Sequence, residues 1–117
     1  MSHKVLVVDD EADVRTFISA VLKKHGYEPI TAVNGAEGLQ KARQEKPALV
    51  ILDLQMPQQT GTDFYRNFQK GKEFAGTPII IVSGLPGRGL AVKKAAAVFD
   101  KPIDPDEFIA AVEKALA

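Results

Sequence analysis

Unbroken runs of apolar residues mark strand-length segments along the chain. Three of these runs hold no polar residue: Val5–Val8, Leu49–Leu52 and Ile79–Val82. Continuous apolarity indicates strands that are covered on both faces, as in a parallel sheet. A weaker run spans residues 28–32, where Pro29 has no N–H to donate to a neighbouring strand, so this run is expected at an edge of the sheet. Residues 97–99 form a short fifth candidate.

Helical periodicity fills the intervals between these runs. One apolar stripe recurs at helical spacing and stops before Gly26; it consists of Val14, Phe17, Ile18, Val21 and Leu22. Three later helices have recognisable starts: the capping box of Asn34 with Glu37, Thr62 or Asp63 ahead of Phe64 and Phe68, and Asp104 followed by Pro105. A weaker helix is expected at about residues 90–96. This alternation predicts an α/β fold, with a five-stranded parallel sheet and helices on both faces.

Length and composition limit the classes of function. The 117 residues suffice for one domain and not for two, so a single domain over residues 1–117 is expected. Fifteen basic and fifteen acidic residues cancel, which argues against a nucleic-acid or membrane-surface role driven by charge. The lack of cysteine excludes disulfides and thiolate metal sites. With no apolar run of membrane-spanning length and no signal peptide ahead of the first strand, we expect a cytoplasmic protein.

Chemically active side chains follow four of the predicted strands. In an open α/β sheet, ligands bind beyond the carboxyl ends of the strands. The residues expected at that edge are Asp9, Asp10, Glu11, Asp53, Ser83 and Lys101. Clustered carboxylates repel one another, so a cation is expected to offset them, and Mg²⁺ suits oxygen ligands that leave room for water and phosphate. A carboxylate can also act as a nucleophile toward phosphorus.

The same residues carry a family resemblance that covers essentially the whole chain. The motifs are Val7–Glu11, Leu52–Pro57 with Gly61, Val82–Gly84 and Asp100–Pro102, in this order and each after a predicted strand. Together they resemble the successive motifs of response-regulator receiver domains from two-component signalling. The resemblance implies a flavodoxin-like sheet with strand order 2-1-3-4-5. That order agrees with the edge position expected for the strand that contains Pro29.

The resemblance also implies a role for each site residue. Asp53 would accept a phosphoryl group from a histidine kinase or a phosphotransfer protein. Asp10 would bind Mg²⁺ directly, Asp9 mostly through water, and Asp53 and the backbone carbonyl of Gln55 would complete the ligand set. Ser83 and Lys101 would hold the phosphoryl group. The phosphorylated domain would then act on a downstream protein target or on an output domain outside this sequence.

Two features depart from the family pattern. The segment from Ser83 to Lys101 is several residues shorter than is usual, and Val98 stands where the family has Tyr or Phe. Phe99 is one residue later, and the alternation of a strand should point it to the opposite face. Valine has a single stiff side-chain torsion. We therefore expect activation to be read out by ordering of residues 84–92, and not by rotation of an aromatic side chain.

Two other functions compete with the receiver interpretation. A Mg²⁺-dependent phosphohydrolase would also use Asp53 as nucleophile, but many such enzymes place an acid–base Asp two residues later, where this chain has Gln55. An interaction module that no longer uses phosphorylation would have the same fold. The presence of all the chemical positions argues against that second alternative.

Overall fold

The computed structural model describes residues 3–53, 60–83 and 95–117. Five strands lie in these ranges: β1 (Lys4–Val8), β2 (Glu28–Ala32), β3 (Leu49–Asp53), β4 (Ile79–Ser83) and β5 (Ala97–Asp100). The helices are α1 (Ala12–Lys24), α2 (Gly35–Glu45), α3 (Thr60–Lys70) and α4 (Pro105–Leu116), with a short 3₁₀ helix, η2 (Lys72–Phe74).

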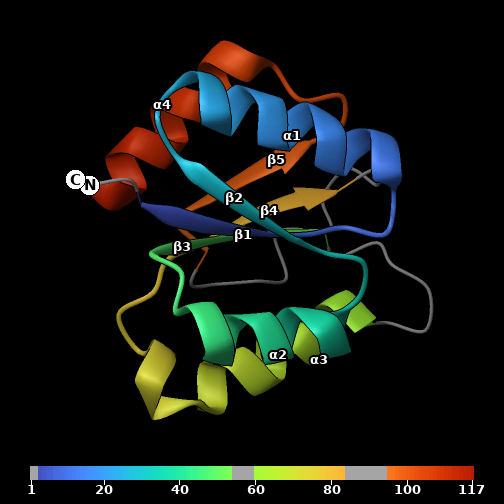
Figure 1. Ribbon diagram of the computed structural model, residues 1–117, viewed down its shortest axis with the longest axis vertical. Helices are drawn as coiled ribbons and strands as arrows, with labels where there is room; N and C mark the ends of the chain where they lie inside the picture. The colour runs from blue at the N-terminus through green and yellow to red at the C-terminus, as the bar shows by residue number, and fades with distance from the viewer. Residues whose placement is uncertain (1–2, 54–59, 84–94) are drawn as a thin grey trace.

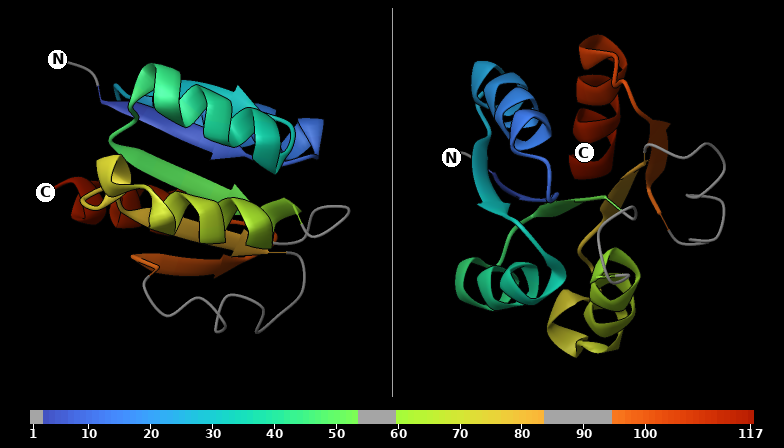
Figure 2. Two further views of the ribbon diagram at one scale, coloured as in Figure 1. Left: turned by 90° about the horizontal axis from the view of Figure 1, so that it is seen from below. Right: turned by 90° about the vertical axis from the view of Figure 1, so that its right-hand side faces the viewer.

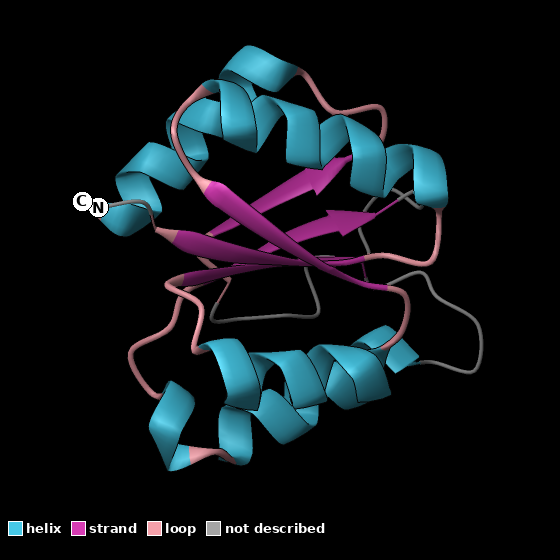
Figure 3. Cartoon of the chain, viewed as in Figure 1, coloured by secondary structure: helices cyan, strands magenta, loops and turns pink. Residues whose placement is uncertain are grey.

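All strand pairs are parallel, and the strand order is β2-β1-β3-β4-β5. Helices α1 and α4 cover one face of the sheet and α2 and α3 cover the other (Figures 1 and 3). The end-on view in Figure 2 shows the sheet as the middle of three layers. The predicted fold class and strand order are confirmed. The strand that contains Pro29 lies at an edge, as its missing N–H requires.

The alternation of side chains along the strands creates two apolar layers. In β1, Leu6 and Val8 pack toward α2 and α3, whereas Val5 and Val7 pack toward α1 and α4. Leu52 and Ile51 of β3 divide between the layers in the same way. Because both faces are buried in the central strands β1, β3 and β4, these strands have no solvent-facing side and need apolar residues at consecutive positions. The unbroken runs in the sequence follow from this requirement.

Local capping fixes where two of the helices begin. The Asn34 side chain accepts a hydrogen bond from the Glu37 backbone N–H at 2.8 Å, and the Glu37 carboxylate accepts one from Val33 N–H at 3.0 Å. The Asp104 carboxylate caps α4 by accepting from the backbone N–H groups of Asp106 and Glu107. Both predicted starts are confirmed. These short polar side chains satisfy N–H groups that have no partner inside the helix.

Two expected helix boundaries have a different outcome. Helix α3 begins at Thr60, two residues before the earlier of the two expected starts. Its buried Phe64 and Phe68 define the face that meets the sheet, but such a stripe does not define where the first turn begins. Of the helix expected at 90–96, residues 90–94 lie outside the described residues, and Ala95 and Ala96 are not helical. The segment 84–92, expected to order on activation, also lies outside them.

Strand β5 separates its two large apolar side chains onto opposite faces. Val98 is 41% exposed, whereas Phe99 packs edge-on against Phe108 of α4 with ring centroids 6.0 Å apart. The prediction that Phe99 points away from the face of Val98 is confirmed. The aromatic ring at this position therefore contributes to the core beneath α4.

This arrangement predicts different costs for truncating the two side chains. Phe99→Ala should lower the free energy of unfolding by about 2 kcal/mol, because it removes half-buried contacts with α4. Val98→Ala should change it by no more than about 0.5 kcal/mol. Urea unfolding of both variants measures the difference. Equal losses would contradict the assignment of the two side chains to opposite faces.

Candidate functional site

The carboxyl ends of β1, β3 and β5 bring together three charged side chains that are far apart in the sequence. The Lys101 ammonium, just after β5, lies 3.1 Å from Asp9 Oδ2 and 3.4 Å from Asp53 Oδ2. Asp9 follows β1 directly, and Asp53 is the last residue of β3. The same ammonium lies 2.7 Å from Glu11 Oε1. One cation therefore serves three carboxylates.

The site is largely removed from solvent. Asp9, Asp53 and Ser83 are fully buried. The Lys101 side chain retains 15% of its exposure, whereas that of Glu11 retains 58%. Asp10 is exposed at the rim. The site is thus open on the side of Asp10 and Glu11 and closed beneath Asp53.

Backbone contacts hold Asp9 in place. Its N–H donates to the Ala32 carbonyl of β2 at 3.1 Å, and its own carbonyl accepts a hydrogen bond from Arg15 Nη1 at 2.7 Å. Asp9 Oδ1 accepts from the Glu11 backbone N–H at 2.9 Å. Within the described residues Asp9 Oδ2 has no hydrogen bond, although the Lys101 ammonium lies 3.1 Å away in an ion pair. A buried carboxylate oxygen without a hydrogen bond is a costly arrangement in a metal-free site.

Ser83 is placed by the pairing of the last two strands. It pairs in register with Asp100, and its carbonyl accepts a hydrogen bond from Lys101 N–H at 2.7 Å. This bond ties the start of the loop after β5 to the end of β4. The peptide bond that follows, between Lys101 and Pro102, is cis. The Ser83 side chain and the Lys101 backbone therefore share one edge of the sheet.

Burial and charge together shift two pKa values. Burial raises the pKa of Asp9, and the Glu11 N–H and the nearby Lys101 only partly oppose this. Burial alone would lower the pKa of Lys101, but the carboxylates of Glu11, Asp9 and Asp53 outweigh it and raise that pKa. Lys101 is therefore charged at neutral pH. The raised pKa of Asp9 means that the Glu11 N–H and Lys101 do not fully offset the cost of burying this carboxylate.

A divalent cation would offset the remaining cost of burying these carboxylates. Asp9, Asp10, Glu11 and Asp53 each offer a carboxylate oxygen, and these four oxygens lie within 4.8 Å of one another. All are hard oxygen donors of the kind that Mg²⁺ prefers. Asp9 Oδ2, which has an ion pair with Lys101 but no hydrogen bond, would gain a direct contact with such an ion. The donor set and the electrostatics both suit Mg²⁺.

Most of the residues expected at the site from the sequence do lie together. Asp9, Asp10, Asp53 and Lys101 form one cluster, and Ser83 is buried at the neighbouring strand end. Gln55, whose backbone carbonyl was the remaining expected metal ligand, lies outside the described residues.

Sequence reasoning missed two contacts at this site. Glu11 was visible as the third acid after β1, but nothing in the sequence marked it as the nearest partner of Lys101. Arg15 lies one helical turn beyond Glu11, and this spacing was the only signal that its side chain could reach back to the Asp9 carbonyl.

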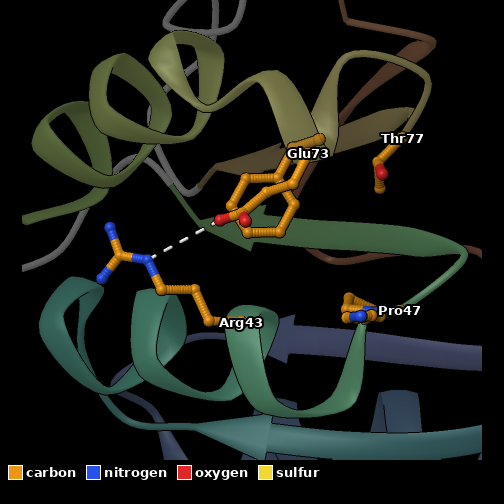
Figure 4. Close-up of a pocket in the computed structure, with 6 residues that line it drawn as sticks. Arg43, Pro47, Glu73 and Thr77 are labelled. Atoms are coloured by element: carbon orange, nitrogen blue, oxygen red, sulfur yellow. Dashed lines mark ion pairs between the residues drawn. The ribbon is translucent and has the colours of Figure 1, made fainter.

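A separate pocket lies at the opposite end of the sheet from this site. A pocket of about 240 Å³ is lined by residues that include Arg43, Pro47, Glu73 and Thr77 (Figure 4). Pro47 and Thr77 precede β3 and β4, so this pocket is at the amino ends of the strands. Its Arg43–Glu73 ion pair, at 3.8 Å, joins two exposed side chains. The pocket has no buried charge comparable to Asp9 or Asp53.

The fold and site together define a doubly wound α/β domain with an acidic, lysine-containing site at the carboxyl edge of its sheet. The family model of the response regulator receiver domain matches residues 5–113. The chain belongs to this family. Its members are signalling domains, and acceptance of a phosphoryl group is general among them. Among the described helices, none has the length and apolarity needed to cross a membrane.

Individual relatives agree with this assignment. Protein Rrf1 of Nitratidesulfovibrio vulgaris is 30% identical over the whole chain, which covers 85% of Rrf1. Protein PilH of Pseudomonas aeruginosa is 39% identical over 68% of the chain and 66% of PilH. The chemotaxis protein CheY4 of Vibrio cholerae has a solved structure with a TM-score of 0.89 and 30% identity, covering 99% of this chain and 100% of CheY4. The chain also matches longer transcriptional regulators, of which it covers between 27% and 33%.

The raised pKa of Asp9 predicts that neutralising this residue stabilises the folded protein, by an amount that depends on pH. Asp9→Asn should raise the melting temperature of the metal-free protein near pH 7, because the folded site disfavours the ionised carboxylate. The gain should shrink as the pH falls through the raised pKa toward 3.8, since Asp9 of the parent is then protonated in both states. Thermal melts from pH 3.5 to 8 in EDTA measure this.

Asp100→Asn provides the control, because Asp100 is exposed on β5. This variant should melt close to the parent throughout the range. A loss of stability in Asp9→Asn at neutral pH would contradict the electrostatic account of the site.

Proposed function

We propose that residues 1–117 form one receiver domain, which accepts a phosphoryl group on the carboxylate of Asp53 with Mg²⁺ bound beside it. The observation that carries this proposal is the position of Asp53. It is fully buried at the end of β3, with the Lys101 ammonium 3.4 Å from its Oδ2 and the buried Asp9 carboxylate in the same cluster. A carboxylate that faces a cation at a crowded acidic edge suits phosphoryl transfer, which depends on positioning and charge neutralisation.

In the proposed reaction, an Asp53 oxygen attacks phosphorus and the bond between phosphorus and the donor breaks. The electron pair of that bond stays with the leaving group, which is the imidazole of a phosphohistidine donor or the acetate of acetyl phosphate. Lys101 neutralises charge on the transferred oxygens, and the Ser83 hydroxyl donates a hydrogen bond to one of them. These contacts stabilise charge that is spread over the phosphoryl oxygens in the transition state.

The proposed metal ligands are Asp9, Asp10 and Asp53, with the backbone carbonyl of Gln55. Bound Mg²⁺ would supply positive charge at the phosphoryl oxygens and relieve repulsion among the carboxylates. Asp10 is exposed at the rim and Asp9 is buried, so the two acids approach the ion from different depths.

A protein donor needs a surface next to the site. A groove of about 510 Å³ adjoins Glu11 and Lys101, and its apolar lining includes Val14, Phe17 and Ile103. Phe17 is 40% exposed on the first half of α1. We propose that a histidine kinase or phosphotransfer protein docks there. The phosphorylated domain then acts on a protein target or an attached output domain, and not on nucleic acid, because its charges balance.

The proposal predicts a single phosphorylation site. Acetyl phosphate with Mg²⁺ should add one phosphoryl group to the intact chain, and Asp53→Asn should abolish this addition. Asp13→Asn is the matched control, because it removes an exposed carboxylate from α1 and should leave labelling intact. Intact mass spectrometry follows all three proteins. Labelling of Asp53→Asn as fast as the parent would show that another residue is the acceptor.

The same assay separates the competing functions. A domain that no longer uses phosphorylation would show no mass increase in any of the proteins. A phosphohydrolase would turn over a phosphate monoester such as p-nitrophenyl phosphate many times, whereas the proposed receiver domain should not.

Metal binding predicts a change in stability. Binding of Mg²⁺ to the folded state alone should stabilise it by about 1.4 kcal/mol when free Mg²⁺ is tenfold above its dissociation constant. Asp10→Ala removes a proposed ligand and should weaken this Mg²⁺-dependent rise in melting temperature. Asp100→Ala should preserve it. The metal assignment fails if Asp10→Ala and the parent respond to Mg²⁺ with the same curve.

A further inference from the structure

We propose that Glu11 is a positioning residue that restrains Lys101 in the unphosphorylated protein and so slows acceptance of the phosphoryl group. This inference rests on the proposed function of Asp53. Lys101 must donate to the incoming phosphoryl oxygens, yet its nearest anion is Glu11 at 2.7 Å, followed by Asp9 at 3.1 Å and Asp53 at 3.4 Å. The ammonium is therefore drawn to the rim of the site as well as to the acceptor.

Both partners of this ion pair are held by their backbones. Glu11 is the N-cap residue of α1, and its N–H donates to Asp9 Oδ1 at 2.9 Å. The Lys101 N–H donates to the Ser83 carbonyl at 2.7 Å. The end of β1 and the end of β5 thus present the two side chains to each other across the mouth of the site. The Glu11–Lys101 contact also has hydrogen-bond geometry.

Exposure makes Glu11 the partner that Lys101 can leave most readily. Water can solvate the Glu11 carboxylate once the ammonium departs, because the side chain is 58% exposed. The fully buried Asp9 and Asp53 have no such compensation. Because one partner is exposed, this ion pair should be weaker than one buried on both sides. The restraint should therefore be modest and reversible, and a phosphoryl group with its additional negative charge should overcome it.

Glu11 also belongs to the four-carboxylate cluster, which provides a competing explanation of its presence. If Glu11 served as a metal ligand, its removal would weaken Mg²⁺ binding and would not speed phosphorylation at saturating Mg²⁺. If it restrains Lys101, its removal at saturating Mg²⁺ should speed phosphorylation. Only the restraint predicts a faster rate under this condition.

The test measures the initial rate of phosphorylation of the full chain by acetyl phosphate, using intact mass at saturating Mg²⁺. Glu11→Gln should raise this rate by about two- to fivefold, the range expected for loss of an ion pair whose acidic partner is exposed. The matched control is Asp13→Asn, which removes a negative charge from the same end of α1. In the described residues Asp13 forms no ion pair, so this variant should keep the parental rate.

A second pair of proteins shows whether Glu11 acts through Lys101. In a Lys101→Gln background, adding Glu11→Gln should not increase the rate of phosphorylation. If phosphorylation of these proteins is slow, mass spectrometry can follow it over hours. An increase that survives there would overturn the restraint and indicate a direct effect of charge on the donor. A Glu11→Gln rate at or below that of the parent would also overturn it.

Phosphorylation of the parent protein distinguishes failure of the restraint from failure of the proposed function. A parent that is phosphorylated on Asp53, with a Glu11→Gln variant that is no faster, overturns only the restraint. A parent that takes up no phosphoryl group overturns the proposed function and the restraint together.

Discussion

The site depends on one ammonium group that is shared among three carboxylates at the edge of the sheet. Asp9 and Asp53 are fully buried, and neither could remain ionised there without a nearby positive charge. Lys101 supplies that charge, and the carboxylates raise its pKa in return. The compensation is incomplete, because Asp9 Oδ2 has no hydrogen bond within the described residues and the pKa of Asp9 is raised. In the proposed function, a divalent cation offsets this remaining cost and then helps to neutralise the negative charge of the phosphoryl group.

The fold makes this concentration of charge possible. Parallel pairing of β1, β3, β4 and β5 places the residue at the end of each strand on one edge, even though Asp9 and Lys101 are far apart in sequence. The apolar layers on the two faces supply the burial that offsets the cost of ionised groups at that edge. The same shielding from water strengthens each charge interaction at the site. The strands therefore determine the positions of the charges, and the apolar core shields those charges from water.

Much of this could be predicted from the sequence, for identifiable reasons. The buried strands contain unbroken apolar runs, and the caps at Asn34 and Asp104 use residue types that are strongly preferred at helix starts, so these signals are clear. The site followed because each charged residue comes at the end of a strand. The start of α3 could not be predicted, because its buried stripe does not define where the first turn begins. The contacts of Glu11 and Arg15 could not be predicted either, because they depend on side-chain reach between elements. Hydrophobic periodicity indicates which face of an element is buried, but it does not indicate which residue of another element a polar side chain contacts.

The most direct test of the central claim is a crystal structure of the protein with Mg²⁺ and beryllofluoride, which mimics a phosphoryl group on a carboxylate. The account predicts beryllium bonded to an Asp53 oxygen and a metal ion in contact with the cluster of Asp9 and Asp10. It also predicts that the Lys101 ammonium leaves Glu11 and donates to a fluoride. A structure in which beryllofluoride binds elsewhere, or in which Lys101 remains on Glu11 with Asp53 occupied, would contradict the account.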